Sequence, residues 1–311
     1  MFELAEHMKA EPAPVPDDAA DLIDWMTGRD WAREAFLWAG GLPVTTQKSP
    51  TVRRALADCA LRMRDWVRLQ EQLHAGAWGK MPEGFVELAF AARVQKEGAG
   101  RARALDTWGD ALNLAAKNRG KTNFEVLEKL ATSWQWTEAV QSTLWRAHEL
   151  MPREVSYLRK LAALAESKGD SAQLDKVYEE WTEAYPGDRF AWASRLYLAV
   201  LRENMDATER AKAFELITQT ELLPEEALIW AWMEARKGED AAVDALERIA
   251  TRAPQARLSP RAALLHAALL DRVGRNAEAR ESWRVASSLS AKLPEERALI
   301  NKLRTRFDAT R

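Results

Sequence analysis

Small and large apolar residues recur along this chain at a fixed spacing. A small or aliphatic residue is followed four positions later by a large apolar residue and three positions beyond that by a small or apolar one. Because residues i, i+4 and i+7 share one face of a helix, each triplet predicts a helix with a buried face. The triplets are Ala32/Phe36/Ala39, Leu69/Leu73/Gly76, Ala104/Trp108/Ala111, Val140/Leu144/Ala147, Leu174/Tyr178/Trp181, Arg210/Phe214/Ile217, Ala242/Leu246/Ile249 and Ala279/Trp283/Ala286. Successive starts are 37, 35, 36, 34, 36, 32 and 37 residues apart, which indicates a repeat of about 35 residues.

Two short sequences return in the same register. Arg29-Asp30-Trp31 returns as Arg64-Asp65-Trp66 after 35 positions, and Leu223-Pro224-Glu225-Glu226 returns as Leu293-Pro294-Glu295-Glu296 after 70, which is twice 35. Since one pattern fits every period, we predict a stack of helical hairpins that bury their apolar faces on one another.

Serine, proline and glycine mark the boundaries of these hairpins. Ser49-Pro50 and Ser259-Pro260 each place an N-cap serine before a proline at the first helical position, which predicts helix starts there. Other prolines are expected to end helices: Pro152, Pro186, Pro224 and Pro254. Three glycines are expected in a left-handed conformation at the turn inside a hairpin: Gly169, Gly238 and Gly274.

The pattern resembles the tetratricopeptide repeat family, whose unit is a helix-turn-helix of about 34 residues. The residues that carry the resemblance are Leu158, Leu161, Gly169, Leu174, Tyr178 and Pro186 in one repeat, and Leu270, Gly274, Ala279, Trp283 and Ala286 in another. The first helices depart from the family, because Ala162, Ala267 and Trp230 stand where it usually has glycine. The arrangement looks most like the C-terminal solenoids of large bacterial repeat proteins.

The resemblance implies an all-α, right-handed superhelical solenoid of about eight repeats. We expect the solenoid over residues 18–293, with repeats that start near residues 18, 50, 85, 121, 155, 191, 223 and 260. Residues 1–17, with prolines at alternate positions, form the expected N-terminal extension, and residues 294–311 the expected C-terminal capping helix. In that cap, which runs from Pro294 to Phe307, one side is expected to be apolar and the other to face solvent. The apolar side has Leu299, Ile300, Leu303 and Phe307, and the solvated side has Arg297, Lys302, Arg304 and Arg306.

The family geometry also predicts a groove, because the first helices of such repeats line the concave surface. Counted from the repeat starts, the inward positions include Glu125, Lys129, Arg159, Glu166, Tyr197, Glu234, Arg261 and Asp271. They combine both signs of charge with an aromatic ring, which suits an extended peptide or a helix of a protein partner.

The charge of the chain argues against nucleic acid and membrane partners. The formal net charge is −2, so no positive field recruits phosphate backbones, and a pentatricopeptide-like RNA binder is disfavoured for the same reason. The longest apolar stretches, such as residues 262–270, are shorter than the ~20 residues of a membrane span, so direct membrane insertion is not expected.

Side chains for catalysis or metal binding do not form a motif. The four histidines, at positions 7, 74, 148 and 266, lack i,i+4 partners, and no nucleophile elbow or phosphate loop is present in the sequence. We therefore expect no metal site, no cofactor and no enzymatic activity. The single cysteine, Cys59, is expected to be a buried apolar side chain.

Fourteen tryptophans are the most conspicuous excess in the composition. Those in the repeat register are expected to pack in the core: Trp31, Trp66, Trp108 and Trp283. Those outside it are expected at the surface, as candidates for ligand stacking: Trp134, Trp136, Trp192, Trp230 and Trp232.

Two functions follow from this pattern as hypotheses. The first is a non-enzymatic scaffold that binds a protein or peptide in the solenoid groove; the alternative is a substrate-positioning or oligomerisation arm of a larger enzyme or membrane-anchored protein. Self-association stays open. A soluble, cytoplasmic protein is the default expectation, and a periplasmic one if an anchor precedes this segment.

Overall fold

The structure is a computed structural model that describes residues 15–74, 84–98, 100–117, 120–217, 224–252 and 259–308. Within these ranges the chain is helical and has no strand, which confirms the predicted all-α class. The chain divides into an N-terminal unit, Met1–Leu150, and a C-terminal unit, Met151–Arg311. The predicted solenoid extends over both units, and its continuity from one to the other stays a prediction. Most of the expected N-terminal extension lies outside the described residues.

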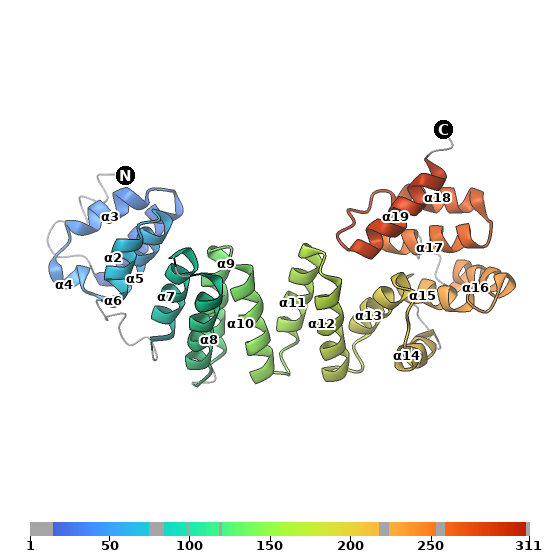
Figure 1. The fold of residues 1–311 in the computed structure, drawn as a ribbon, viewed down its shortest axis with the longest axis horizontal. Coiled ribbons are helices and arrows are strands. Elements are labelled where there is room, and N and C mark those ends of the chain that lie inside the picture. The colour runs from blue at the N-terminus through green and yellow to red at the C-terminus, as the bar shows by residue number, and fades with distance from the viewer. Residues whose placement is uncertain are drawn as a thin grey trace. The chain divides into compact units, whose positions relative to one another are not determined.

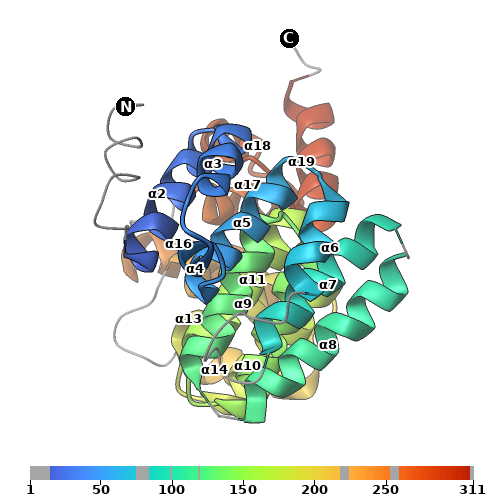
Figure 2. The ribbon, with the colours of Figure 1, turned by 90° about the vertical axis from the view of Figure 1, so that its left-hand side faces the viewer.

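The N-terminal unit is a series of antiparallel helix pairs. Its helices are α2 (Pro16–Gly28), α3 (Ala32–Gly40), α4 (Val44–Gln47), α5 (Pro50–Arg62), α6 (Trp66–His74), α7 (Phe85–Gly98), α8 (Arg101–Lys117), α9 (Lys121–Ser133) and α10 (Thr137–Leu150). Figure 2 shows α5 between α2, α3 and α4 on one side and α6 on the other, and all four pack against it. Helices α7 with α8 and α9 with α10 form the following pairs.

The C-terminal unit continues with the same kind of pairs. Its helices are α11 (Val155–Lys168), α12 (Ser171–Ala184), α13 (Arg189–Leu201), α14 (Ala207–Ile217), α15 (Pro224–Glu234), α16 (Glu239–Arg252), α17 (Pro260–Arg272), α18 (Asn276–Ala286) and α19 (Pro294–Phe307). The first helices of successive pairs also pack on each other, since α15 contacts both α13 and α17. Figure 1 shows α17, α18 and α19 packed together, and α19 also reaches α13.

The eight predicted repeat starts fall within two residues of the starts of eight helices. These helices are α2, α5, α7, α9, α11, α13, α15 and α17. The serines at 49 and 259 are N-caps, as predicted: the Ser49 hydroxyl accepts from the Val52 N–H and the Ser259 hydroxyl from the Ala262 N–H. Assignment of these pairs to the tetratricopeptide family stays a prediction.

A residue with positive φ stands at the turn inside each pair, and these residues keep the repeat period. They are Asp30, Arg64, Gly100, Gln135, Gly169, Glu203, Gly238 and Gly274, spaced 34, 36, 35, 34, 34, 35 and 36 residues apart. In most of these turns the N–H one position later donates to the carbonyl five residues before it, as Trp31 does to Met26 and Asn204 to Ala199. This is the bond that closes a helix C-terminus around a left-handed residue. The prediction for Gly169, Gly238 and Gly274 is confirmed, and four non-glycine residues adopt positive φ in the equivalent turns.

Most tryptophans in the described residues are buried, whether or not they follow the repeat register. Trp108 and Trp283 are buried as predicted, Trp31 is half-buried against the core, and the side chain of Trp66 lies outside the described residues. The predicted surface position of the off-register tryptophans is wrong. Trp136, Trp192, Trp230 and Trp232 are buried and Trp134 is half-buried, because they lie on first helices or beside hairpin turns that pack between neighbouring pairs.

Cys59 is a buried side chain of α5, as predicted. Its Sγ lies 2.8 Å from the hydroxyl oxygen of Thr27 on α2. Burial raises the pKa of the Cys59 thiol to about 11, and this effect outweighs the hydrogen bond with Thr27, which lowers the pKa. The thiol is therefore protonated at neutral pH and packs as an apolar group.

Candidate functional site

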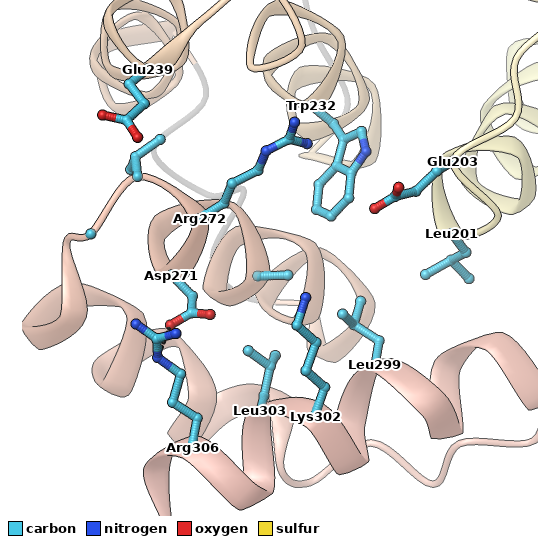
Figure 3. A pocket seen from close by; sticks show the side chains of 13 residues that line it. Leu201, Glu203, Trp232, Glu239, Asp271, Arg272, Leu299, Lys302, Leu303 and Arg306 are labelled. Carbon is cyan, nitrogen blue, oxygen red and sulfur yellow. Dashed lines mark ion pairs between the residues drawn. The ribbon is translucent and has the colours of Figure 1, made fainter.

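The first helices of the C-terminal unit surround a pocket of about 720 Å³, which we call the concave pocket. Its lining comes from α13, α15, α17 and α19, from the start of α16 and from the turns after α13 and α17. Trp232, Leu299 and Leu303 give it an apolar part, and Figure 3 shows the Trp232 ring facing the space between these helices. Curvature of the stack therefore brings together side chains about 100 residues apart in sequence.

Charged side chains surround this apolar part. Arg272, Lys302 and Glu203 extend toward the space beside Trp232 (Figure 3). None of these three charged groups has an ion-pair partner among the described residues. By contrast, the buried Asp271 is paired with Arg306, whose Nε lies 2.5 Å from its Oδ1. Glu239 at the start of α16 also lines the pocket, which thus offers two cations and two anions to a bound molecule.

A second, smaller cavity shares two residues with the concave pocket. It has a volume of about 180 Å³, and Glu203 and Trp232 line both. Its remaining lining includes Met205, Met233 and Phe214, of which Phe214 is exposed. Flexible methionine side chains can adapt to ligands of different shape. An apolar side chain could therefore occupy this cavity beside a segment held in the concave pocket.

The start of α19 is bound by residues that lie far earlier in the chain. The Ser171 hydroxyl donates to Glu295 Oε2 (2.5 Å) and the Arg202 Nε to Glu295 Oε1 (2.9 Å), across 124 and 93 positions. The Tyr197 hydroxyl donates to Glu296 Oε1 (3.1 Å), across 99 positions. These contacts close the C-terminal unit, because they join α12 and α13 to its last helix.

Gly169 also contributes to the contact with the start of α19, because the backbone of the loop before α19 lies against it. A Cβ at Gly169 would lie 2.3 Å from the carbonyl oxygen of Lys292, and its φ is +66°. Only glycine fits both the conformation and the close approach. We call Gly169, Ser171, Tyr197 and Arg202 the docking seat.

The surroundings of Glu295 lower the pKa of its carboxyl group. Burial raises its pKa, but the hydrogen bonds from Ser171 and Arg202 outweigh burial, so the pKa lies below its usual range. The Arg202 guanidinium is shared, since it also pairs with Asp175 and donates to the Ser171 carbonyl (3.0 Å). Glu295 is therefore ionised at neutral pH.

Three of the eight predicted groove residues meet beside the docking seat. Arg261 is ion-paired with Glu166 and with Glu296, and its guanidinium lies 5.5 Å from the centre of the Tyr197 ring. Glu166, Tyr197 and Arg261 also line a cavity of about 180 Å³ together with Leu293. Tyr197 and Arg261 thus contact the protein's own last helix, and Glu166 pairs with Arg261 beside it.

The other five predicted groove residues lie elsewhere. Asp271 lines the concave pocket, Glu234 pairs with Lys237 on α15 and its turn, and Arg159 lies over the Trp181 ring at 5.9 Å. Glu125 is half-buried and Lys129 exposed on α9 of the N-terminal unit.

The residues that sequence reasoning missed are Arg272, Glu203 and the pocket-facing side of α19. Lys302 is exposed, as predicted, and it also lines the concave pocket, which the sequence did not indicate. Helical periodicity identifies the face of α19 that packs on α17, but it does not show what lies beside that face. The recurrence of Leu-Pro-Glu-Glu was the one available signal, since it marked α19 as equivalent to the first helix of a repeat.

Comparison with known proteins does not assign this chain to a family. No protein-family model matches it, and no curated protein matches it. Among the described residues, no three His, Cys, Asp or Glu side chains are placed to hold a metal ion together. No described helix combines the length and apolar character needed to cross a membrane.

Proposed function

We propose that this protein is a non-enzymatic scaffold that binds a segment of another protein in the concave pocket of its C-terminal unit. The observation that carries the proposal is the combination of Trp232 and leucines with Arg272, Lys302 and Glu203, which have no ion-pair partner in the described part of the chain, around one pocket. Ligand sites typically have about 300–1,000 Å³, and this pocket of about 720 Å³ lies in that range. The resemblance to tetratricopeptide repeats supports the same function, since that family binds proteins through its first helices.

The chemistry of the pocket suits a short amphipathic segment. Apolar side chains of the partner would pack against Trp232 and Leu299, where burial excludes water. An acidic partner residue would pair with Lys302 or Arg272, and a basic one with Glu203. Since these three groups have no ion-pair partner among the residues that the structure describes, the partner need not break such an ion pair to bind them.

A pair of charge reversals on α19 tests this proposal. Lys302→Glu inverts a charge in the pocket, whereas Arg304→Glu, two residues further on the same helix, inverts an exposed charge outside the pocket lining. Proteins captured from native cells by wild-type protein and by Arg304→Glu, but about tenfold less by Lys302→Glu, are the expected partners. Circular dichroism establishes that both variants are folded.

A photo-cross-linking side chain at Ala268, which lines the pocket, then identifies the partner segment. Cross-links to one segment with apolar and charged residues support the proposal. If Lys302→Glu captures the same proteins as Arg304→Glu, or if cross-links to Ala268 do not form with a captured protein, the concave pocket is not the binding site.

A further inference from the structure

Leu-Pro-Glu-Glu occurs twice in this chain, and each time its second glutamate is buried and bound by an arginine. Glu226 on α15 accepts from Arg189 Nε (3.1 Å) and Nη2 (2.5 Å), and Glu296 on α19 accepts from Arg261 Nε (2.9 Å). Each arginine belongs to the first turn of the preceding first helix, 37 or 35 residues earlier. This ion pair therefore joins neighbouring first helices, and it does not depend on the contacts between α19 and the earlier helices α12 and α13.

The docking seat adds contacts that the repeat does not require. Ser171 and Arg202 bind the first glutamate of the tetrapeptide at α19, Tyr197 binds the second, and Gly169 accommodates the backbone before it. Leu293 is buried beside a small cavity formed by residues of α11, α12, α13 and α17. The seat thus recognises both carboxylates, the leucine and the backbone, which together define an acidic peptide motif.

We propose that the docking seat binds an acidic Leu-Pro-Glu-Glu segment of a partner protein, and that residues 292–296 occupy it as an internal competitor in the free protein. This inference goes beyond the proposed function, because the docking seat and the concave pocket are lined by different residues. The occupant is identified by chemistry: two adjacent carboxylates at a helix start, preceded by proline and leucine.

The seat can be vacated without unfolding the last helix. Ile300, Leu303 and Phe307 of α19 belong to an apolar core shared with α13, α15, α17 and α18, so these apolar contacts hold α19 in place when the polar contacts of the seat are lost. Arg202 is 28% exposed on its side chain, so water can solvate it when Glu295 leaves. A partner carboxylate would restore the same hydrogen bonds with Ser171 and Arg202.

An internal segment competes at a high effective concentration, of millimolar order for a short connection. A free peptide should therefore bind measurably only after the internal contact is weakened. Glu295→Gln does this selectively, because it removes one charge but leaves the buried Glu296 with Arg261 in place.

The test measures binding of a fluorescent peptide with the sequence of residues 290–298 by anisotropy. We expect binding to Glu295→Gln to be about tenfold or more tighter than to wild type, because the internal competitor is weakened. A second peptide with both glutamates replaced by glutamine is the matched ligand control and should not bind. Adding Arg202→Gln to Glu295→Gln should abolish binding, while adding Arg304→Gln, an exposed change further along α19, should leave it unchanged.

Circular dichroism first establishes that Glu295→Gln is folded; if it is not, Glu295→Asp, which keeps the charge but shortens its reach, takes its place. No binding to the folded variant, or equal binding of the glutamine peptide, overturns the inference. The capture experiment with Lys302→Glu is unaffected by either result, so failure of the docking seat and failure of the concave pocket are distinguishable.

Discussion

The starts of α15 and α19 have the same sequence and share one ion pair, but they differ in what surrounds them. Glu226 and Glu296 are both buried at the third helical position and are both bound by an arginine of the preceding first helix. At the start of α15, Arg189 of α13 is the arginine that binds Glu226. At α19 the Tyr197 hydroxyl also donates to Glu296, and the neighbouring Glu295 is held by two further side chains.

The difference separates two kinds of contact in a repeat protein. The arginine–glutamate pair connects neighbouring repeats and can recur wherever the repeat recurs. The contacts of the docking seat connect repeats that are not neighbours, and they exist only because the C-terminal unit curves back on itself. Substitutions that remove one kind of contact should leave the other intact.

Removing the buried glutamates should have the largest effect. Glu226→Ala removes the ion pair with Arg189 and should cost about 1.5–3 kcal/mol, the range for hydrogen bonds to charged groups. Glu296→Ala also loses the Tyr197 bond and the bond from its own Leu293 N–H (3.4 Å), so it should cost about 3–4 kcal/mol. Urea unfolding followed by circular dichroism measures both. Equal costs would show that the closure contact adds nothing to the repeat contact.

Replacing two turn glycines with alanine separates the cost of the close backbone contact at Gly169 from the cost of a positive φ. Gly274→Ala should cost about 1 kcal/mol, because its φ of +77° disfavours a Cβ but no atom lies within 4 Å. Gly169→Ala has the same conformational penalty and in addition meets the Lys292 carbonyl, so we expect about 2–3 kcal/mol. Thermal unfolding measures the loss of stability in both variants. An equal loss in the two would contradict the close contact between Gly169 and the Lys292 carbonyl.

Acidification should weaken the start of α19. The pKa of Glu295 lies below 4.5 in the folded protein, since the bonds from Ser171 and Arg202 outweigh the opposing effect of burial. A carboxyl group with a lowered pKa contributes stability that is present above its unfolded pKa and is lost as the pH falls through its folded pKa. Stability should therefore decrease below about pH 4.5 more steeply in wild type than in Glu295→Gln. If the free energy of unfolding falls with pH equally steeply in the two proteins, groups other than Glu295 cause the acid sensitivity.

The sequence predicted the register of this fold because its signals are local. Ser49-Pro50 and Ser259-Pro260 define helix starts through bonds within one turn, and the glycine at 169 signals its turn directly. The equivalent turn at Arg64 has no glycine, so its positive φ could not be inferred from the residue type.

The candidate site was less predictable, because it depends on curvature accumulated over several repeats. Tyr197 and Arg261 were expected to face a partner, yet they contact residues of α19, and no local pattern distinguishes the two cases. The same reason explains why the pocket beside Lys302 was not predicted, since its place there depends on α13 and α15 lying across from it.

The smallest predicted effect separates the two acidic partners of Arg202. Asp175 is 43% exposed on its side chain and pairs with Arg202 within the neighbouring helices α12 and α13, whereas Glu295 comes from α19 and is 20% exposed. Since exposed ion pairs are worth about 0–1 kcal/mol, Asp175→Asn should cost about 0.5 kcal/mol or less. Glu295→Gln should cost more, because its carboxylate also accepts from Ser171. If urea unfolding instead gives Asp175→Asn the larger loss, Arg202 is held mainly by its own helix pair, and the contact with α19 is secondary.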